Sequence, residues 1–190
     1  MGKIVVSELV SLDGVVEAPG GEPNYSHTGW VAKFQDQEQI QWKQDEVMAH
    51  EALLIGRITY ESFAGAWPHF KGPFADKMNA MPKYVASRTL RNPEWNNSHV
   101  LQGDAMAAVA KLKKEIRGDI LVHGSRTLVN ALKAHDLVDE YRLMIFPIIL
   151  CSGTRLFEET PDATTLELIS TEALKNGAAI VSYRVVRSGS

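Results

Sequence analysis

The sequence predicts an α/β fold: one domain over residues 1–190, with a mostly parallel sheet of about eight strands, about four flanking helices and an antiparallel C-terminal strand. Three observations lead to this fold class. The 190 residues, 45% of them apolar, suit a single domain with a sizeable core. Strand-like and helical segments alternate up to about residue 135, which favours parallel pairing. Beyond residue 138 strand-like runs follow one another, and Asn176-Gly177 is a hairpin signal between the last two.

The individual elements follow from apolar runs and from the residues that interrupt them. Short, mostly apolar runs bounded by turn residues predict the strands: 3–10, 52–55, 83–87, 99–101, 119–123, 138–149, 166–170 and 179–186. Segments with spaced apolar residues predict the helices: 34–50, 58–66, the stretch between Asp104 and Gly118, and the stretch from Gly124 to about residue 134. Residues 11–30 form a long polar loop. Pro68 ends the second helix, and Asp104 caps the third.

Composition and charge exclude several classes of protein. The formal net charge of −3 and the pI near 6.1 argue against a nucleic-acid partner, which a basic excess would favour. Cys151 is the single cysteine, so an internal disulfide or a Cys-rich zinc site is excluded, and no metal is expected. No apolar stretch approaches the length of a membrane span, and Ser7, Glu8 and Asp13 interrupt any signal-peptide pattern. We therefore expect a cytoplasmic protein without a membrane partner.

Two predicted strand-to-helix turns carry residue types that suit phosphate. The strand 52–55 runs into Gly56, and Arg57 opens the helix that follows. In the same way, the strand 119–123 runs into Gly124, and a predicted helix follows. Free backbone amides and the positive end of a helix dipole attract phosphate at such turns, although an ordinary helix cap explains each one alone. Two such turns in one small sheet fit a dinucleotide, despite the absence of the G-x-G-x-x-G fingerprint.

A third turn carries a hydroxyl beside an arginine. Ser87 ends the predicted strand 83–87 and Arg88 follows it, and this pair suits a terminal phosphate monoester. An arginine near the ribose is what separates NADP from NAD binding. The alternative for this pair is a surface turn with a solvated arginine.

These motifs occur in order along nearly the whole chain, together with Ser11-Leu12-Asp13-Gly14 and with Leu137-Val138-Asp139-Glu140-Tyr141 followed by Pro147. On them the chain resembles the dihydrofolate-reductase-like superfamily, most closely the branch of the RibD C-terminal reductase domain of bacterial riboflavin biosynthesis. The resemblance implies an NADPH-dependent reductase of a small nitrogen heterocycle, similar to 5-amino-6-(5-phosphoribosylamino)uracil reductase. It implies contacts to the cofactor phosphates from Gly56, Arg57, Thr59, Ser87, Arg88, Gly124, Ser125, Arg126 and Thr127. It places the backbone near Leu9 and the side chain of Val16 beside the nicotinamide.

The chain departs from that pattern in two places. Dihydrofolate reductases carry a pterin-binding acid early in their first long helix, and the aligned position here is Ile40. This argues against dihydrofolate reduction, although Asp36 lies one helical turn earlier on the same face and is the acid that can substitute. The glycine-rich turn after the long strand begins here with Cys151, which we interpret as a small buried filler because no base partner is evident.

The substrate side is defined by a few polar residues near the long loop. Asp13 and Asp36 are the candidate catalytic acids, Asp13 because it follows the first strand; the alternative for Asp13 is a turn residue in Asp-Gly. Ser11 and Trp30 are the candidate substrate contacts, and loop packing is the alternative for Trp30. A diverged dihydrofolate reductase and a non-catalytic nucleotide-binding protein remain alternative functions.

The segments Tyr141 to Leu150 and Ala179 to Val186 carry many apolar residues on both strand faces. A peripheral strand with two apolar faces needs a cover. We therefore expect a homodimer that buries part of this C-terminal region.

Overall fold

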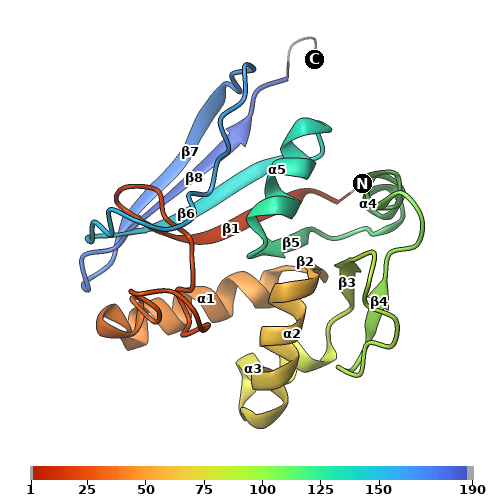
Figure 1. Cartoon of the computed structure of the whole chain (residues 1–190), viewed down its shortest axis with the longest axis horizontal. Coiled ribbons are helices and arrows are strands. Elements are labelled where there is room, and N and C mark those ends of the chain that lie inside the picture. Colours follow the sequence, from red (N-terminus) through yellow and green to blue (C-terminus); the bar gives the residue numbers. More distant parts are fainter. Residues whose placement is uncertain (1, 188–190) are drawn as a thin grey trace.

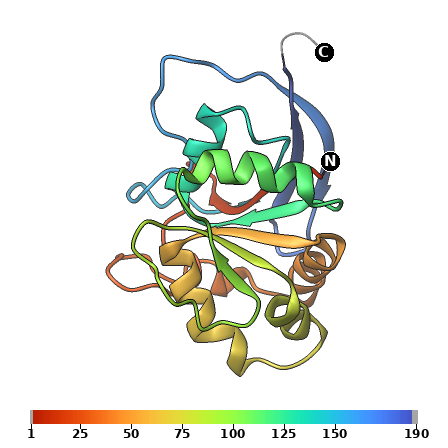
Figure 2. The same cartoon turned by 90° about the vertical axis from the view of Figure 1, so that its right-hand side faces the viewer.

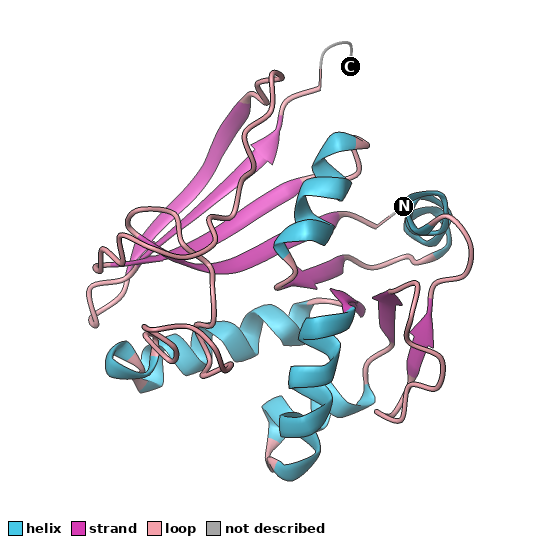
Figure 3. Ribbon diagram, in the orientation of Figure 1, coloured by secondary structure: helices cyan, strands magenta, loops and turns pink. Residues whose placement is uncertain are grey.

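The computed structural model describes residues 2–187 and shows one eight-stranded sheet of order β4-β3-β2-β5-β1-β6-β8-β7 (Figures 1 and 3). The strands are β1 (Ile4–Ser11), β2 (Ala52–Gly56), β3 (Lys83–Ala86), β4 (Ser98–Val100), β5 (Ile120–His123), β6 (Glu140–Phe146), β7 (Leu166–Ala173) and β8 (Ala179–Val185). The helices are α1 (Gln37–Ala49), α2 (Arg57–Ala66), α3 (Pro73–Ala80), α4 (Ala105–Glu115) and α5 (Arg126–Ala134), with 3-10 turns at Ala32–Phe34 and Trp67–His69.

The predicted fold class is confirmed. The strands β4, β3, β2, β5, β1 and β6 run parallel to their neighbours. The last two strands are antiparallel: β8 pairs with β6, and β7 pairs with β8. Every residue of β2 is buried, as expected for a central parallel strand that helices cover on both faces.

Helices lie on both faces of the sheet, with α4 and α5 on one side and α1, α2 and α3 on the other (Figure 2). Successive residues of β1 lie on opposite faces of the sheet. Val6 belongs to the apolar cluster that includes Leu132 of α5, whereas Val5 belongs to the cluster that includes Met78 of α3. A third apolar cluster lies under the loop that follows β1, where Trp30 packs against Phe146 of β6. The long loop is therefore fastened to the sheet and not free in solvent.

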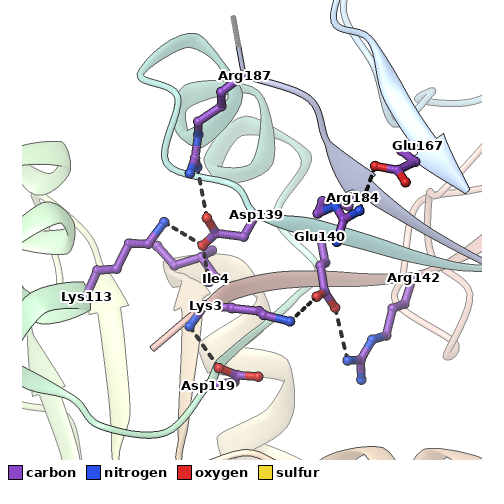
Figure 4. A network of polar contacts seen from close by, with 10 residues as sticks. All are labelled: Lys3, Ile4, Lys113, Asp119, Asp139, Glu140, Arg142, Glu167, Arg184 and Arg187. Carbon is purple, nitrogen blue, oxygen red and sulfur yellow. Dashed lines mark hydrogen bonds and ion pairs between the residues drawn. The ribbon is translucent and has the colours of Figure 1, made fainter. Parts of the chain in front are cut away.

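A network of ion pairs joins the amino ends of the central strands (Figure 4). Lys3, just before β1, pairs with Glu140 at the start of β6. Asp139 accepts a hydrogen bond from the Ile4 amide at 2.8 Å and pairs with Arg187 at 2.9 Å. These contacts hold together the amino ends of β1 and β6. The strand-to-helix turns lie at the opposite, carboxyl ends of the strands.

Three local expectations were wrong, each for a physical reason. The first long helix begins at residue 37 and not 34, because Asp36 is its N-cap and accepts from the Gln39 amide at 2.8 Å. Helix α3, with Pro73 in its first turn, was not predicted. Cys151 is exposed and not a buried filler, because it lies in the turn beyond β6, where its backbone is left-handed (φ 62°).

Candidate functional site

A cavity of about 750 Å³ lies at the carboxyl edge of the sheet, where β1 separates from β5. The parallel pairing of β1 with β5 ends at Ser7 and His123, whereas β1 continues beside β6 as far as Ser11. Glu8 is thus the first β1 residue without a β5 partner. Residues from the loop after β1, from α1 and α2, and from the turn after β5 complete the wall. The position and size are those of a ligand site in an open α/β sheet.

The turns after β2 and β5 pack directly against each other. A Cβ atom placed on Gly56 would lie 1.8 Å from Ser125 Oγ, and one placed on Gly124 would lie 2.6 Å from Thr59 Oγ1. The two hydroxyls are themselves in contact, since Thr59 Oγ1 donates to Ser125 Oγ at 3.5 Å. Both turns therefore form one surface, which carries the N-termini of α2 and α5. Thr59, Gly124, Ser125 and Arg126 also line the cavity.

Ser125 has a left-handed backbone with φ 62°, which is uncommon for a residue other than glycine. Gly124 before it also has a positive φ of 60°. Such outliers concentrate at ligand sites, where the surrounding structure enforces them. Here the close packing of Gly56 and Thr59 enforces this turn.

The other residues predicted to contact phosphate lie along the same edge of the sheet, farther from the cavity. Gly56 pairs in register with Ala86, so Arg57 and Ser87 leave neighbouring strands side by side. Arg57 pairs with Glu61 at 2.8 Å, and Ser87 Oγ accepts hydrogen bonds from two backbone amides of its own turn. Arg57, Ser87 and Arg88 do not line the cavity itself, and neither does Thr127, which is exposed in the first turn of α5.

Leu9 and Val16, the residues expected beside a nicotinamide, both line the cavity. Leu9 lies on β1 directly after Glu8. The Val16 amide donates to the carbonyl of Thr154 at 2.9 Å, which holds this part of the loop against the turn beyond β6. The two residues line the cavity from different segments.

The four residues predicted to act on the substrate lie outside the cavity wall. Asp13 accepts hydrogen bonds from Ser11 Oγ and from the amides of Leu150 and Cys151, and these bonds lower the pKa of its carboxyl to about 2. An acid ionised at neutral pH has no proton to donate. Asp36 caps α1, Ser11 is buried in the turn with its hydroxyl bonded to Asp13, and Trp30 is buried against Phe146.

Sequence reasoning missed Glu8, the carboxyl that does line the cavity. The residue is only 7% exposed, and its Oε1 is buried without a hydrogen-bond partner among residues 2–187. Burial raises the pKa of Glu8 to about 8, against the opposing effects of the Lys43 ammonium and the Gly124 amide. One signal was present in the sequence: an acid inside an otherwise apolar strand must be paired, neutral or functional.

A buried polar cluster lies beside Glu8. The Lys43 ammonium donates to Ser7 Oγ at 2.7 Å and to Glu46 Oε2 at 2.9 Å, and Ser7 Oγ donates to the same carboxylate at 2.8 Å. Burial favours neutral Glu46, but the Lys43 charge and these hydrogen bonds outweigh it and lower its pKa. Burial and the Lys43 charge lower the pKa of His123 to about 3, so this ring is neutral.

Helix α1 presents Gln39, Ile40 and Lys43 to the cavity. Gln39 is buried, and its side-chain oxygen accepts from Asn176 at 3.1 Å. Glu38 instead accepts from the Lys175 amide, outside the cavity. The helix thus offers an amide and a cation to the cavity.

In the part of the chain that the structure describes, no three His, Cys, Asp or Glu side chains gather closely enough to hold a metal ion. None of the helices in residues 2–187 is both long and apolar enough to cross a membrane.

Comparison with known proteins places this geometry among reductase-like folds. The family model described as the RibD C-terminal domain matches residues 2–180. Two Bacillus subtilis (strain 168) proteins are similar: uncharacterized protein YyaP is 27% identical over 187 residues, covering 95% of this chain and 94% of its own. Uncharacterized protein YwjB is 28% identical over 170 residues, covering 90% of this chain and 91% of its own.

Three solved structures share the fold. A putative riboflavin biosynthesis protein from Shewanella sp. PV-4 has a TM-score of 0.78 at 20% identity, over 97% of this chain and 99% of its own. A pyrimidine reductase-like protein from Corynebacterium diphtheriae has a TM-score of 0.66 at 14% identity, over 98% and 93%. Dihydrofolate reductase from Enterococcus faecalis, complexed with NADP(H), has a TM-score of 0.64 at 14% identity, over 97% and 96%. At these identities the likeness shows the fold alone.

Proposed function

Because the chain belongs to the RibD C-terminal domain family, with a dihydrofolate-reductase-like fold, we propose that it is an NADPH-dependent reductase of a small nitrogen heterocycle. One observation carries the proposal: the surface formed by the turns after β2 and β5 opens into a cavity of about 750 Å³ beside the free end of β1. A cofactor with phosphates on that surface would extend its nicotinamide toward Leu9 and Val16.

The residues at the edge fit NADPH. Thr59 and the backbone of residues 124–127 would hold the pyrophosphate at two helix N-termini. Arg57, Ser87 and Arg88 would hold the 2′-phosphate, on the outer part of the same edge. When bound, the cofactor supplies a hydride. The chain's own task is to orient the two reactants, exclude water and deliver a proton to the atom next to the reduced carbon.

The cavity wall favours a flat heterocycle that is not a pterin. Apolar side chains from α2, α3 and the turn between them supply one wall, among them Ile58, Phe63, Trp67 and Phe74. The α1 wall supplies Gln39 and Ile40, so the fork of two charge-assisted hydrogen bonds that a carboxylate makes has no equivalent there. This composition of the cavity wall argues against the alternative that the protein is a diverged dihydrofolate reductase.

The test is a titration of NADPH and NADH followed by a search for turnover. Absorbance loss at the NADPH band is measured with 5-amino-6-(5-phosphoribosylamino)uracil-type pyrimidines and, separately, with dihydrofolate as the acceptor. We expect NADPH to bind more tightly than NADH and dihydrofolate to remain unreduced. Dihydrofolate turnover near roughly one per second would restore the pterin function. Tight NADPH binding without turnover of any acceptor would favour the alternative that the protein binds nucleotide without catalysis.

We also propose that the chain forms a homodimer through its C-terminal strands and acts in the cytoplasm. The two strands expected to be peripheral, β6 and β8, lie inside the sheet, and the edge strand is β7. Strand β7 is exposed along its whole length, and Leu168 and Ile169 on it are 53% and 48% exposed. An exposed edge strand with apolar side chains needs a cover. A second copy of the chain would supply it.

A further inference from the structure

The candidate site holds a buried carboxyl group that no structural role explains. Glu8 lies where β1 loses its β5 partner, next to Leu9, and it lines the cavity. Its Oε1 is buried without a hydrogen-bond partner in the described part of the chain. An unsatisfied buried polar atom costs stability, so its presence calls for a role in ligand binding or chemistry.

Burial keeps Glu8 in its neutral form. Two charged groups of α1 act on its pKa, Lys43 and Glu46, and His123 of β5 lines the same cavity. Lys43 lowers the pKa of Glu8 by more than Glu46 raises it, and His123 is neutral. Burial is then the dominant effect on Glu8. Because its Oε1 has no donor to bind, the Lys43 charge and the Gly124 amide offset only part of the cost of burying the ionised form.

Resting on the function proposed above, we propose that Glu8 is the proton donor of this site and that its substrates carry a C=N or C=O group whose heteroatom accepts a hydrogen bond. The π bond of that group breaks. Its carbon would take the hydride that NADPH supplies, and its nitrogen or oxygen would take the Glu8 proton. The Glu8 carboxylate that remains would take up one proton from the solvent, so that substrate, NADPH and one proton give the reduced substrate and NADP⁺.

This assignment sets a substrate class. A neutral carboxylic acid donates a hydrogen bond, whereas an ionised carboxylate only accepts. The site is therefore built for a ring with an in-plane lone pair, such as a cyclic imine or a conjugated carbonyl. A protonated amidine, which a carboxylate would bind, has no lone pair to receive the proton.

The proposal can be tested without knowing the substrate, by using the two forms of the cofactor as probes. A positive charge within a few ångströms lowers the pKa of a carboxyl by about 1–3 units. The cationic ring of NADP⁺ next to Leu9 should therefore expel the Glu8 proton, and the neutral ring of NADPH should not. With a starting pKa of about 8, NADP⁺ binding at pH 7 should release roughly 0.4 to 0.9 proton.

Proton release is measured by isothermal titration calorimetry in two buffers of different ionisation enthalpy. The wild type is compared with Glu8→Gln and with Glu140→Gln. Glu140 is a matched control: it is 5% exposed, against 7% for Glu8, but lies outside the cavity among the ion pairs of Figure 4. We expect the difference in proton release between NADP⁺ and NADPH to vanish in Glu8→Gln and to persist in Glu140→Gln.

A second measurement needs only the wild type, in case Glu8→Gln does not fold. The ratio of NADP⁺ to NADPH affinity should rise roughly 8- to 80-fold between pH 6 and pH 9, while the 2′-phosphate, common to both, cancels. A flat ratio with both forms bound overturns the role of Glu8 and leaves the reductase proposal standing. Failure of both forms to bind overturns the reductase proposal itself.

Discussion

The contact between the two strand-to-helix turns predicts a specific effect of Gly56→Ala. Residue 56 has φ −84°, so alanine meets no backbone strain there, and the effect is purely steric. The new Cβ would lie 1.8 Å from Ser125 Oγ and 2.8 Å from Ser125 Cβ, so rotating the serine hydroxyl away does not relieve the clash. The turn after β5 must move, and it is the turn assigned to the pyrophosphate.

The magnitude follows from two opposing effects. Overpacking costs about 1–3 kcal/mol, and the reduced freedom of the unfolded chain returns about 0.4–1 kcal/mol. The net loss of about 1–2 kcal/mol corresponds to a melting temperature lower by about 2–8 °C for a domain of this size. Displacing one phosphate-binding turn should weaken NADPH binding roughly 5- to 30-fold.

Two further variants make this prediction sharp. Ser125→Gly removes both clashing atoms and suits the left-handed backbone at that position, so the Gly56→Ala, Ser125→Gly double variant should recover most of the lost stability. Gly65→Ala in α2 is the control, because nothing lies within 4 Å of its new Cβ; it should stabilise by about 0.5–1 kcal/mol. Thermal melts and NADPH fluorescence titrations supply the data. If Gly56→Ala matches the wild type in both, the packing argument is refuted.

Three other predictions address the cofactor, the turn after β1 and the assembly. Arg88→Ala should weaken NADPH by about 1.5–3 kcal/mol and leave NADH nearly unchanged in the same titration, and equal weakening would refute the 2′-phosphate assignment. The pKa of Asp13 is lowered from 3.8 to about 2, so its hydrogen bonds stabilise the fold above pH 4 and are lost as the pH falls toward 2. Urea melts should show Asp13→Asn less stable than the wild type at pH 7, by a margin that shrinks below pH 4, and a constant margin would contradict this account. Light scattering at micromolar concentration should give a dimer that Leu168→Glu, Ile169→Glu dissociates, and a wild-type monomer would exclude it.

Much of the fold was determined by local patterns in the sequence. The eight predicted strand segments all overlap the eight strands of the sheet, since short, mostly apolar runs bounded by turn residues are recognised without reference to distant residues. The glycines that end β2 and precede α5 also marked the turns correctly as strand-to-helix junctions: Gly124 supplies a positive φ, and Gly56 leaves room for Ser125. Helix α3 was missed because its eight residues carry too little periodicity to stand out from a loop.

The chemistry of the cavity was decided by the tertiary structure. Asp13 and Glu8 are both acids on or just beyond β1, and the sequence around them favoured Asp13 as the proton donor. Folding brings three hydrogen-bond donors to Asp13 from its own turn and from residues 150 and 151, and these keep it ionised. The same folding surrounds Glu8 with α1 and the turn after β5 and leaves its Oε1 without a donor. A pKa depends on burial and on neighbours that lie far apart in the chain, so which of two carboxyl groups holds a proton is a property of the packed molecule.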